Sequence, residues 1–386
     1  RTRNCGFGTK MIPMFKVATA EGARDAVATT LFYGMLGEGP RTEEFVEKLQ
    51  KLFDQPRVLA LNSCTSALAL ACRLADTKGC EIYSTAFTMI ATNTSAKEAG
   101  GSIVWGDADP KTLALDLDKA KNFLNRRPDV RVVMLTLVGG IPPHGLDSFF
   151  QWCDERGTKL ILDCAHALNS TYKGRHVSHY GHISCLSFQA IKHLQTADGG
   201  AIVFKNQADY ERAEKLKWFG MTRKVPEGKT RLEHQMTADV EEAGYKIHMN
   251  DIAASIGLAN FDLALKSVER SRLNASALTA GLVNVPGLQL LEPPAESDPA
   301  WWVYGFLTKR RAETMAALVK AGIVSTPMWR PNNLYSCFQR ANISGSLDGL
   351  ERIAAEVLFV PNGWWVSDQD IEQIIQTIKK VHQEAQ

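Results

Sequence analysis

A lysine and an aspartate stand in apolar surroundings that suit them for chemistry. Asp163 closes the apolar run 159–163 (KLILD), where a buried carboxylate needs a partner such as a protonated ring nitrogen. Lys192 follows Ser187 by five residues and lies in a turn between the apolar runs 183–188 and 200–204. Burial there would lower the pKa of its amine and make it a nucleophile. Each residue alone also fits a purely structural role.

A third polar segment, 62–67 (NSCTSA), lies between an apolar run and a helical pattern. The N-terminal amides of such a helix could hold a phosphate group. The alternative is that the serines and the threonine only cap the helix. All three polar segments end predicted strands, and ligands of open parallel sheets bind at strand ends, where loops and helix N-termini meet.

The elements that must position these residues follow a regular alternation. From about residue 57, short apolar runs alternate with longer amphipathic patterns, which predicts a doubly wound α/β fold with a mostly parallel sheet between helices. A long helix is predicted over about 250–273. The seven predicted strands are 57–61, 80–84, 102–105, 130–137, 159–163, 183–188 and 200–204.

The pattern changes after the proline-containing connector 283–299. A strand-like run, 300–308, is followed by helical patterns at 313–322 and 368–385. We therefore expect a large α/β domain over residues 11–274 and a smaller α+β domain over residues 275–386. Residues 1–10 are expected to be a leader outside the fold.

Composition excludes several classes of protein. The 386 residues are 45% hydrophobic, and 44 basic residues nearly balance 42 acidic ones, so we expect no general attraction to nucleic acid or membranes. No run approaches the roughly 20 apolar residues of a membrane span. The cysteines are scattered without CxxC pairs, which indicates reduced thiols. We expect a soluble, cytoplasmic protein without a metal site.

The order of the three polar segments is that of fold-type-I pyridoxal-phosphate (PLP) enzymes, and further motifs are more specific. The chain resembles the DegT/DnrJ/EryC1/StrS sugar aminotransferases over almost its full length, which implies a fold-type-I PLP transferase with PLP as cofactor. The resemblance rests on the segments 14–17 (MFKV), 34–45 (GMLGEGPRTEEF), 62–68 (NSCTSAL), 88–92 (TMIAT), 163–166 (DCAH), 187–192 (SFQAIK), 199–200 (GG) and 244–258 (GYKIHMNDIAASIGL).

The resemblance implies a role for each matching residue of the site. Lys192 would be the catalytic residue, holding the aldehyde of PLP as a Schiff base and then shuttling protons. Asp163 would pair with the pyridine nitrogen, and His166 would approach the ring hydroxyl. Ser187 would join the turn 62–67 around the phosphate. Family dehydratases have histidine where Lys192 stands, so the lysine favours transamination.

Of the residues that depart from the usual family pattern, three bear directly on how the cofactor would be held. Cys64, which with Thr65 would hold the phosphate, replaces a glycine and limits how closely the backbone can approach an anion. Met89 stands where many relatives place an aromatic ring over the cofactor, which a thioether covers less rigidly. Lys246 replaces an asparagine that, in relatives, contacts the phosphate of the other subunit, and its ammonium could make this contact instead. The resemblance therefore implies a homodimer with shared active sites.

The smaller domain would meet the substrate. Trp329 and Arg330 lie in a segment that relatives bring to the sugar, and could bind the sugar face and the diphosphate; a packed tryptophan beside a surface arginine is the alternative. The four tryptophans Trp301, Trp302, Trp364 and Trp365 are expected to fill the interface between domains. We expect a ping-pong aminotransferase that uses L-glutamate to convert a nucleotide-linked keto-sugar to the amino-sugar. Alternatives are a PLP-dependent sugar dehydratase, an aminotransferase acting on a keto-sugar without a nucleotide, and a non-catalytic binding or regulatory relative.

Overall fold

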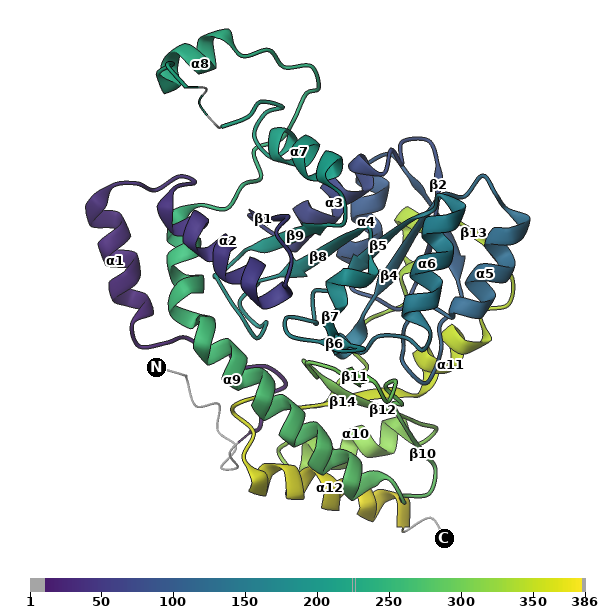
Figure 1. Ribbon diagram of the computed structural model, residues 1–386. Coiled ribbons are helices and arrows are strands. Elements are labelled where there is room, and N and C mark those ends of the chain that lie inside the picture. Colours follow the sequence, from purple (N-terminus) through teal and green to yellow (C-terminus); the bar gives the residue numbers. More distant parts are fainter. Residues whose placement is uncertain (1–10, 224, 226, 384–386) are drawn as a thin grey trace.

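An eight-stranded sheet forms the centre of the computed structural model, which describes residues 11–223, 225 and 227–383 (Figure 1). In order across the sheet, the strands are β1 (Val58–Leu61), β9 (Gly200–Phe204), β8 (Ile183–Ser187), β5 (Lys159–Asp163), β4 (Val132–Thr136), β2 (Glu81–Thr85), β3 (Ser102–Gly106) and β13 (Asn342–Ile343). β9 runs antiparallel to both of its neighbours, and the other neighbouring pairs are parallel. The predicted mostly parallel sheet is confirmed, with β13 as an additional strand.

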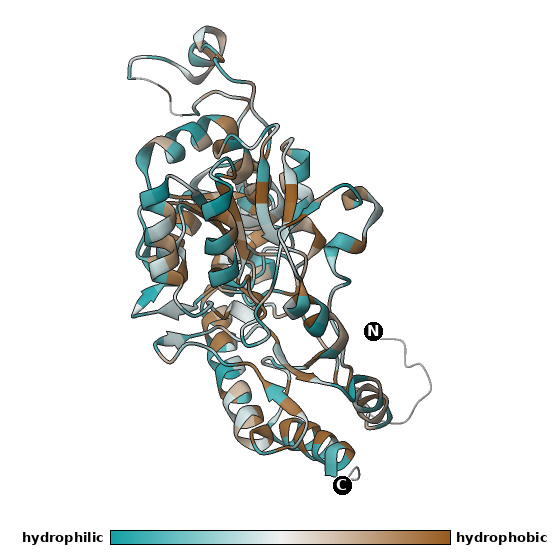
Figure 2. Ribbon diagram, turned by 90° about the vertical axis from the view of Figure 1, so that its right-hand side faces the viewer, coloured by the Kyte–Doolittle hydropathy of each residue, from teal (hydrophilic) through white to brown (hydrophobic). Residues whose placement is uncertain are grey.

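Alternate residues of the strands enter two hydrophobic cores, one on each face of the sheet. In β5, Leu160 and Leu162 belong to one core and Ile161 to the other, as the two-residue period of a strand requires. Figure 2 shows apolar residues, in brown, along strands in the middle of the molecule. The core with Ile161 is covered by α3 (Cys64–Leu74), α4 (Ile90–Glu98), α7 (Gln207–Leu216) and α11 (Asp348–Glu356), and the core with Leu160 by α2 (Pro40–Phe53), α5 (Leu117–Arg126), α6 (Leu146–Arg156) and α9 (Asp251–Leu282).

The long helix α9 connects the large sheet to a second, smaller layer. The side chain of Asn250 caps its start by accepting a hydrogen bond from the amide of Ala253 at 2.9 Å. Its second half enters a third core together with an antiparallel sheet and two further helices. These are β10 (Leu288–Leu290), β12 (Tyr304–Thr308), β14 (Val357–Val360), α10 (Arg311–Lys320) and α12 (Asp368–Gln383). Because α9 runs without a break across residue 274, the division of the chain there stays a proposal.

The remaining elements surround these layers. Figure 1 shows α8 at the end of a segment that projects away from the large sheet. No helix among the described residues is long and apolar enough to cross a membrane. The expected leader, 1–10, lies outside those residues, and the cytoplasmic location stays a prediction. The elements are α1 (Ala23–Tyr33), α8 (Arg231–Thr237), β6 (Thr171–Tyr172), β7 (Arg175–His176), β11 (Ser297–Asp298) and the 3₁₀ turns Val138–Gly140, Val177–Tyr180, Asn332–Leu334 and Ser336–Phe338.

Candidate active site

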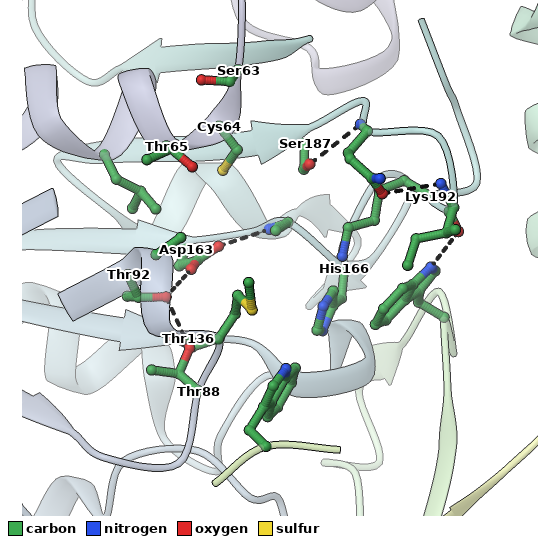
Figure 3. A pocket seen from close by; sticks show the side chains of 18 of the residues that line it. Ser63, Cys64, Thr65, Thr88, Thr92, Thr136, Asp163, His166, Ser187 and Lys192 are labelled. Carbon is green, nitrogen blue, oxygen red and sulfur yellow. Dashed lines mark hydrogen bonds between the residues drawn. The ribbon is translucent and has the colours of Figure 1, made fainter. Parts of the chain in front are cut away.

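A cavity of about 520 Å³ lies at the carboxyl ends of β4, β5 and β8 (Figure 3). The last residues of these strands, Thr136, Asp163 and Ser187, line it. The position is the one where open parallel sheets bind ligands, and the volume lies within the roughly 300–1,000 Å³ of small-molecule sites. The cavity brings together most of the residues predicted for the site, namely Cys64, Thr65, Met89, Asp163, His166, Ser187, Lys192 and Trp329.

The N-terminus of α3 forms one end of the cavity. Ser63 caps the helix, because its Oγ accepts from the amide of Ser66 at 3.0 Å. The amides of Cys64 and Thr65 have no partner within the helix, so this end can bind an anion. Burial and the charge of Asp163 raise the pKa of the Cys64 thiol well above its usual value. Cys64 therefore stays a neutral thiol at the cavity wall.

Gly200 allows the sheet to approach this helix end. It pairs with Ser187 across β8 and β9. A Cβ atom at Gly200 would lie 2.5 Å from the backbone nitrogen of Cys64. Real Cβ atoms do not come so close, so the strand and the amides of α3 can meet only with glycine here. This contact places the Ser187 hydroxyl beside the predicted phosphate site.

Asp163 is a buried carboxylate with two hydrogen-bond donors. The Thr92 hydroxyl donates to Oδ2 at 2.6 Å, and the amide of Ala165 donates to Oδ1 at 3.1 Å. Burial raises the pKa of Asp163, whereas these two donors and the charge of Lys192 oppose the rise. The two donors therefore hold the carboxylate in one orientation at the cavity wall, where it can pair with a cation.

A chain of hydroxyl groups supports this carboxylate. Thr92 lies 2.9 Å from the Thr88 hydroxyl, which in turn lies 3.0 Å from the Thr136 hydroxyl. Each hydroxyl has one proton, and Thr92 gives its own to Asp163, so Thr88 must donate to Thr92 and Thr136 to Thr88. The chain of donors thus points from Thr136 towards Asp163. Met89, half exposed at the N-cap of α4, lies beside it on the cavity wall.

Sequence reasoning did not assign a role to these threonines. Thr88 directly precedes Met89, the N-cap of α4, and Thr92 lies in the first turn of that helix, so the two hydroxyls meet at the start of α4. Thr136 is the last residue of β4 and the polar residue of the predicted strand 130–137 nearest its end, so it is a further polar strand end like Asp163. Both features are visible in the sequence and could have indicated the chain.

The ring of His166 is neutral and carries its proton on Nε2. Its Nδ1 accepts a hydrogen bond from the amide of Gly139 at 3.3 Å, so that nitrogen has no proton. Burial moves the pKa of His166 well below its usual value, and the charges of Lys192 and His193 act in the same direction. The Nε2–H group can therefore donate to an oxygen in the cavity. Its predicted contact with the ring hydroxyl of PLP stays a prediction.

Lys192 lies in the turn that follows β8. Its amide donates to the carbonyl of Gln189 at 2.8 Å, and the side chain of Gln189 accepts from the amide of Ile191 at 3.1 Å. Burial lowers the pKa of Lys192 from 10.5 to about 8, although Asp163 and Cys64 act in the opposite direction. An amine with this pKa is partly neutral near pH 8, so it can serve as a nucleophile and as a base.

Stacked rings form another wall of the cavity. The ring of His166 lies 4.0 Å from that of Trp302 and 5.6 Å from that of Trp329, centroid to centroid, and the rings are nearly parallel. Trp302 therefore lines the cavity, so the expectation that it only fills an interface is incomplete. Its neighbour Trp301 stacks on Tyr304 at 5.5 Å and packs in the third core. Trp301 also packs against the core with Ile161, but of the two adjacent tryptophans Trp302 is the one that lines the cavity.

Two predicted residues lie outside the cavity. Lys246 is exposed, and its Nζ lies 6.0 Å from the ring centroid of Trp218. Arg330 is also exposed, donates to the carbonyl of Leu334 at 2.9 Å and lies over the ring of Tyr335. Their predicted contacts, with the phosphate of another subunit and with a substrate diphosphate, stay predictions.

The groups around the cavity fit the functional parts of PLP. The amides of α3 and the Ser187 hydroxyl suit its phosphate, Asp163 suits a protonated ring nitrogen, and Lys192 suits its aldehyde. Among the described residues, no group of three or more histidine, cysteine, aspartate or glutamate side chains could hold a metal ion. The amides of α3 together with Asp163 and Lys192 suit an organic phosphate that carries an electrophilic carbon.

Known proteins with similar sequences and structures identify the family of the chain. The family model described as "DegT/DnrJ/EryC1/StrS aminotransferase family" matches residues 18–379. AtS13 from Actinomadura melliaura is 34% identical with a TM-score of 0.89, and 97% of this chain and 100% of that chain are covered. The sugar aminotransferase CalS13 from Micromonospora echinospora is 30% identical with a TM-score of 0.87, covering 96% and 100%.

A relative whose name states its substrate has a lower sequence identity to this chain. The dTDP-4-dehydro-2,3,6-trideoxy-D-glucose 4-aminotransferase of Saccharopolyspora spinosa is 28% identical over 278 residues, which cover 71% of this chain and 71% of that protein. The family match spans nearly the whole chain, and the residues of the cavity fit the cofactor that the family's aminotransferases use. The chain belongs to the DegT/DnrJ/EryC1/StrS family and is a PLP-dependent sugar aminotransferase.

Proposed function

We propose that this aminotransferase moves the amino group of L-glutamate onto a keto-sugar that is linked to a nucleotide. The observation that carries the proposal is the position of Lys192 in one cavity with Asp163 and the N-terminus of α3. Removal of a proton from the carbon next to the amino nitrogen requires an electron sink, which PLP bound in this cavity would supply. Because donor and acceptor use the same site, the two half-reactions follow a ping-pong course.

Each cavity residue has a task in this proposal. Lys192 Nζ first holds the cofactor through a covalent bond and, once released, moves protons between carbon atoms. The Asp163 carboxylate, fixed by Thr92 and the amide of Ala165, keeps the ring nitrogen protonated. His166 donates from Nε2–H to an oxygen of the ring. The buried wall around these groups excludes water from the reacting carbon.

The substrate would enter beside the substrate-side loop, residues 326–334. The ring of Trp329 lies on the cavity wall and offers a face to a sugar. Arg330 follows it at the surface, and its guanidinium keeps donors for a phosphate beyond the one that contacts Leu334. The nucleotide-linked substrate in the name of the Saccharopolyspora spinosa relative supports a nucleotide sugar for this chain as well.

We further propose a homodimer that joins through the end of α1 and the segment after it. The side chains of Leu31, Phe32, Tyr33, Met35 and Leu36 are between 42% and 86% exposed. A contiguous exposed apolar patch of this kind marks an interface, and α1 lies at the edge of the molecule beside α9 (Figure 1). The exposed Lys246 would then reach the phosphate site of the second copy.

The principal test uses purified protein and PLP. Wild-type protein should develop a visible absorption band, and glutamate should bleach it as the amino group is transferred. Lys192→Ala should show neither change, whereas Lys205→Ala, which alters a surface lysine paired with Asp154 at 2.7 Å, should behave as wild type. A wild-type protein that binds PLP without forming the band would refute the role of Lys192.

Product analysis then decides the substrate class. Protein that has already taken the amino group from glutamate would be mixed with 3-keto and 4-keto nucleotide sugars, and in parallel with the same sugars without the nucleotide. Amination of a nucleotide sugar alone supports the proposal. Amination of the free keto-sugar with equal efficiency, or loss of a hydroxyl without gain of nitrogen, would contradict it.

Hybrid dimers test the shared site. Inactive Lys192→Ala and Lys246→Ala proteins, mixed and allowed to exchange subunits, would form a hybrid in which one site has both lysines. Activity should then rise to about one quarter of the wild-type value, since half of the dimers each regain one of two sites. If Lys246 served its own subunit, mixing would restore nothing, and if it served no site, Lys246→Ala would already be active before mixing.

A further inference from the structure

Trp302 makes two contacts with the turn that carries Lys192. Its indole Nε1–H donates to the carbonyl of Ile191 at 3.0 Å. Its ring face lies under the lysine, with Lys192 Nζ 3.6 Å from the ring centroid. A cation within about 6 Å of the centroid of a tryptophan ring is attracted to its face. One side chain therefore holds both the backbone of the turn and the amine at the end of the lysine.

Trp302 is itself fixed by its surroundings. It is buried, and its amide donates to the carbonyl of Gly139 at 3.2 Å. Its ring stacks on His166 at 4.0 Å and on Phe15 at 4.8 Å. Gly139 has a φ of 67°, and a Cβ there would lie 3.3 Å from the carbonyl of Val303, so the supporting turn depends on glycine. The ring therefore cannot follow the lysine when the lysine moves.

We propose that Trp302 is a positioning residue for Lys192, and that its ring face holds Nζ whenever the amine is free of the cofactor. The inference rests on the proposed function, because it requires a lysine that alternates between a covalent bond and a free amine. When the free amine takes the proton from the α-carbon of the donor, the C–H bond breaks and an N–H bond forms at Nζ. The electron pair of the C–H bond passes to the bound cofactor.

An aromatic face suits this task better than a carboxylate in direct contact. A carboxylate would hold the ammonium in an ion pair and compete for its proton. The ring attracts the ammonium but accepts no proton, so Nζ can return the proton to carbon. Among the described residues Asp163 makes no ion pair with Lys192: its oxygens accept from Thr92 and from the amide of Ala165, and its charge acts on the amine only from a distance.

Kinetics of the half-reaction with glutamate test the proposal. Trp302→Phe keeps a ring face and removes the N–H group, and Trp302→Leu removes both. The leucine variant should react about 2- to 30-fold more slowly, the range that corresponds to the loss of a cation–π contact, and the phenylalanine variant should lose less. The isotope effect with α-deuterated glutamate should increase, because proton transfer becomes the slow step. PLP affinity should change little.

Trp301→Leu is the matched control. It removes the neighbouring tryptophan, whose ring stacks on Tyr304 and which is not among the residues that line the cavity. It should lower the melting temperature without changing the isotope effect. If Trp301→Leu slowed the half-reaction as much as Trp302→Leu, or if Trp302→Leu kept the wild-type rate and isotope effect, the proposal would be wrong.

A second measurement uses the full chain without cofactor. Lysines are dimethylated with ¹³C, and the Lys192 signal is assigned by its loss in Lys192→Arg. In wild type the ring current of Trp302 should shift this signal upfield, the shift should persist in part in Trp302→Phe, and it should vanish in Trp302→Leu. An unshifted wild-type signal overturns the inference alone, whereas an absorption band that survives in Lys192→Ala overturns the proposed function beneath it.

Discussion

Replacing Thr92 by valine should weaken PLP binding, because Thr92 donates to the buried carboxylate of Asp163. The bond is 2.6 Å long, and Asp163 is only 4% exposed. A hydrogen bond to a charged group contributes about 1.5–3 kcal/mol, so a ligand that needs Asp163 ionised should bind about 10- to 150-fold more weakly. Valine has nearly the shape of threonine, so the change removes the donor without opening a cavity.

The effect of pH on this variant has a definite sign. Burial raises the pKa of Asp163, and the Thr92 hydroxyl is the first of the groups that oppose the rise. Without that hydroxyl the pKa rises further, so the carboxyl group takes up a proton at a higher pH than in wild type. The affinity of Thr92→Val for PLP should therefore fall earlier as pH is lowered and recover as pH is raised.

Titration of the visible absorption band with PLP at several pH values measures both effects. Thr92→Ser keeps a hydroxyl and should bind nearly as wild type. Thr94→Val is the matched control on the same helix, since the Thr94 hydroxyl donates to the carbonyl of Ile90 at 2.9 Å and not to Asp163. Wild-type affinity of Thr92→Val at every pH would refute the reasoning, as would an equal loss in Thr94→Val.

Three further outcomes follow from the same geometry. Gly200→Ala should abolish tight PLP binding in equilibrium dialysis, because its Cβ would lie 2.5 Å from the first backbone nitrogen of α3. Asn332→Leu should raise the KM for the keto-sugar and leave the half-reaction with glutamate unchanged in stopped-flow traces, because Asn332 Nδ2 donates to the carbonyl of Thr88 at 2.9 Å and thereby fixes the loop of Trp329. The rate at which cofactor-free protein captures PLP should rise with pH around a midpoint near 8 rather than 10.5, since the neutral amine of Lys192 attacks the aldehyde.

The large sheet could be predicted because burial on both faces makes its strands continuously apolar. All five residues of β4 are buried, and the sequence VVMLT shows it. β13 could not be predicted, since Asn342 and Ile343 are exposed and join the sheet only by pairing with β3. α9 extends to Leu282, beyond the predicted end near 273, because buried polar residues such as Ser271 and Asn274 interrupt its apolar pattern.

The sequence predicts the site residues that lie at the ends of strands. It does not predict the contacts between residues that are far apart in the chain. Asp163 and Ser187 are polar residues at the ends of apolar runs, which a single segment of sequence reveals. The bond between Trp302 and Ile191 joins positions that are 111 residues apart, and the sequence WW does not tell which ring faces the cavity. Contacts of this kind depend on how the layers pack, which local patterns do not specify.

Burial acts against charge on both Asp163 and Lys192, so hydrogen bonding must decide which of them stays charged. Asp163 accepts from the Thr92 hydroxyl and from an amide, and the chain of donors behind Thr92 keeps that hydroxyl pointing at the carboxylate. Lys192 Nζ faces the ring of Trp302, which attracts an ammonium less strongly than a paired carboxylate would. The carboxylate therefore keeps its charge while the amine gives up its proton near pH 8. This separation supplies an anion for the cofactor ring and a neutral amine for its aldehyde in the same cavity.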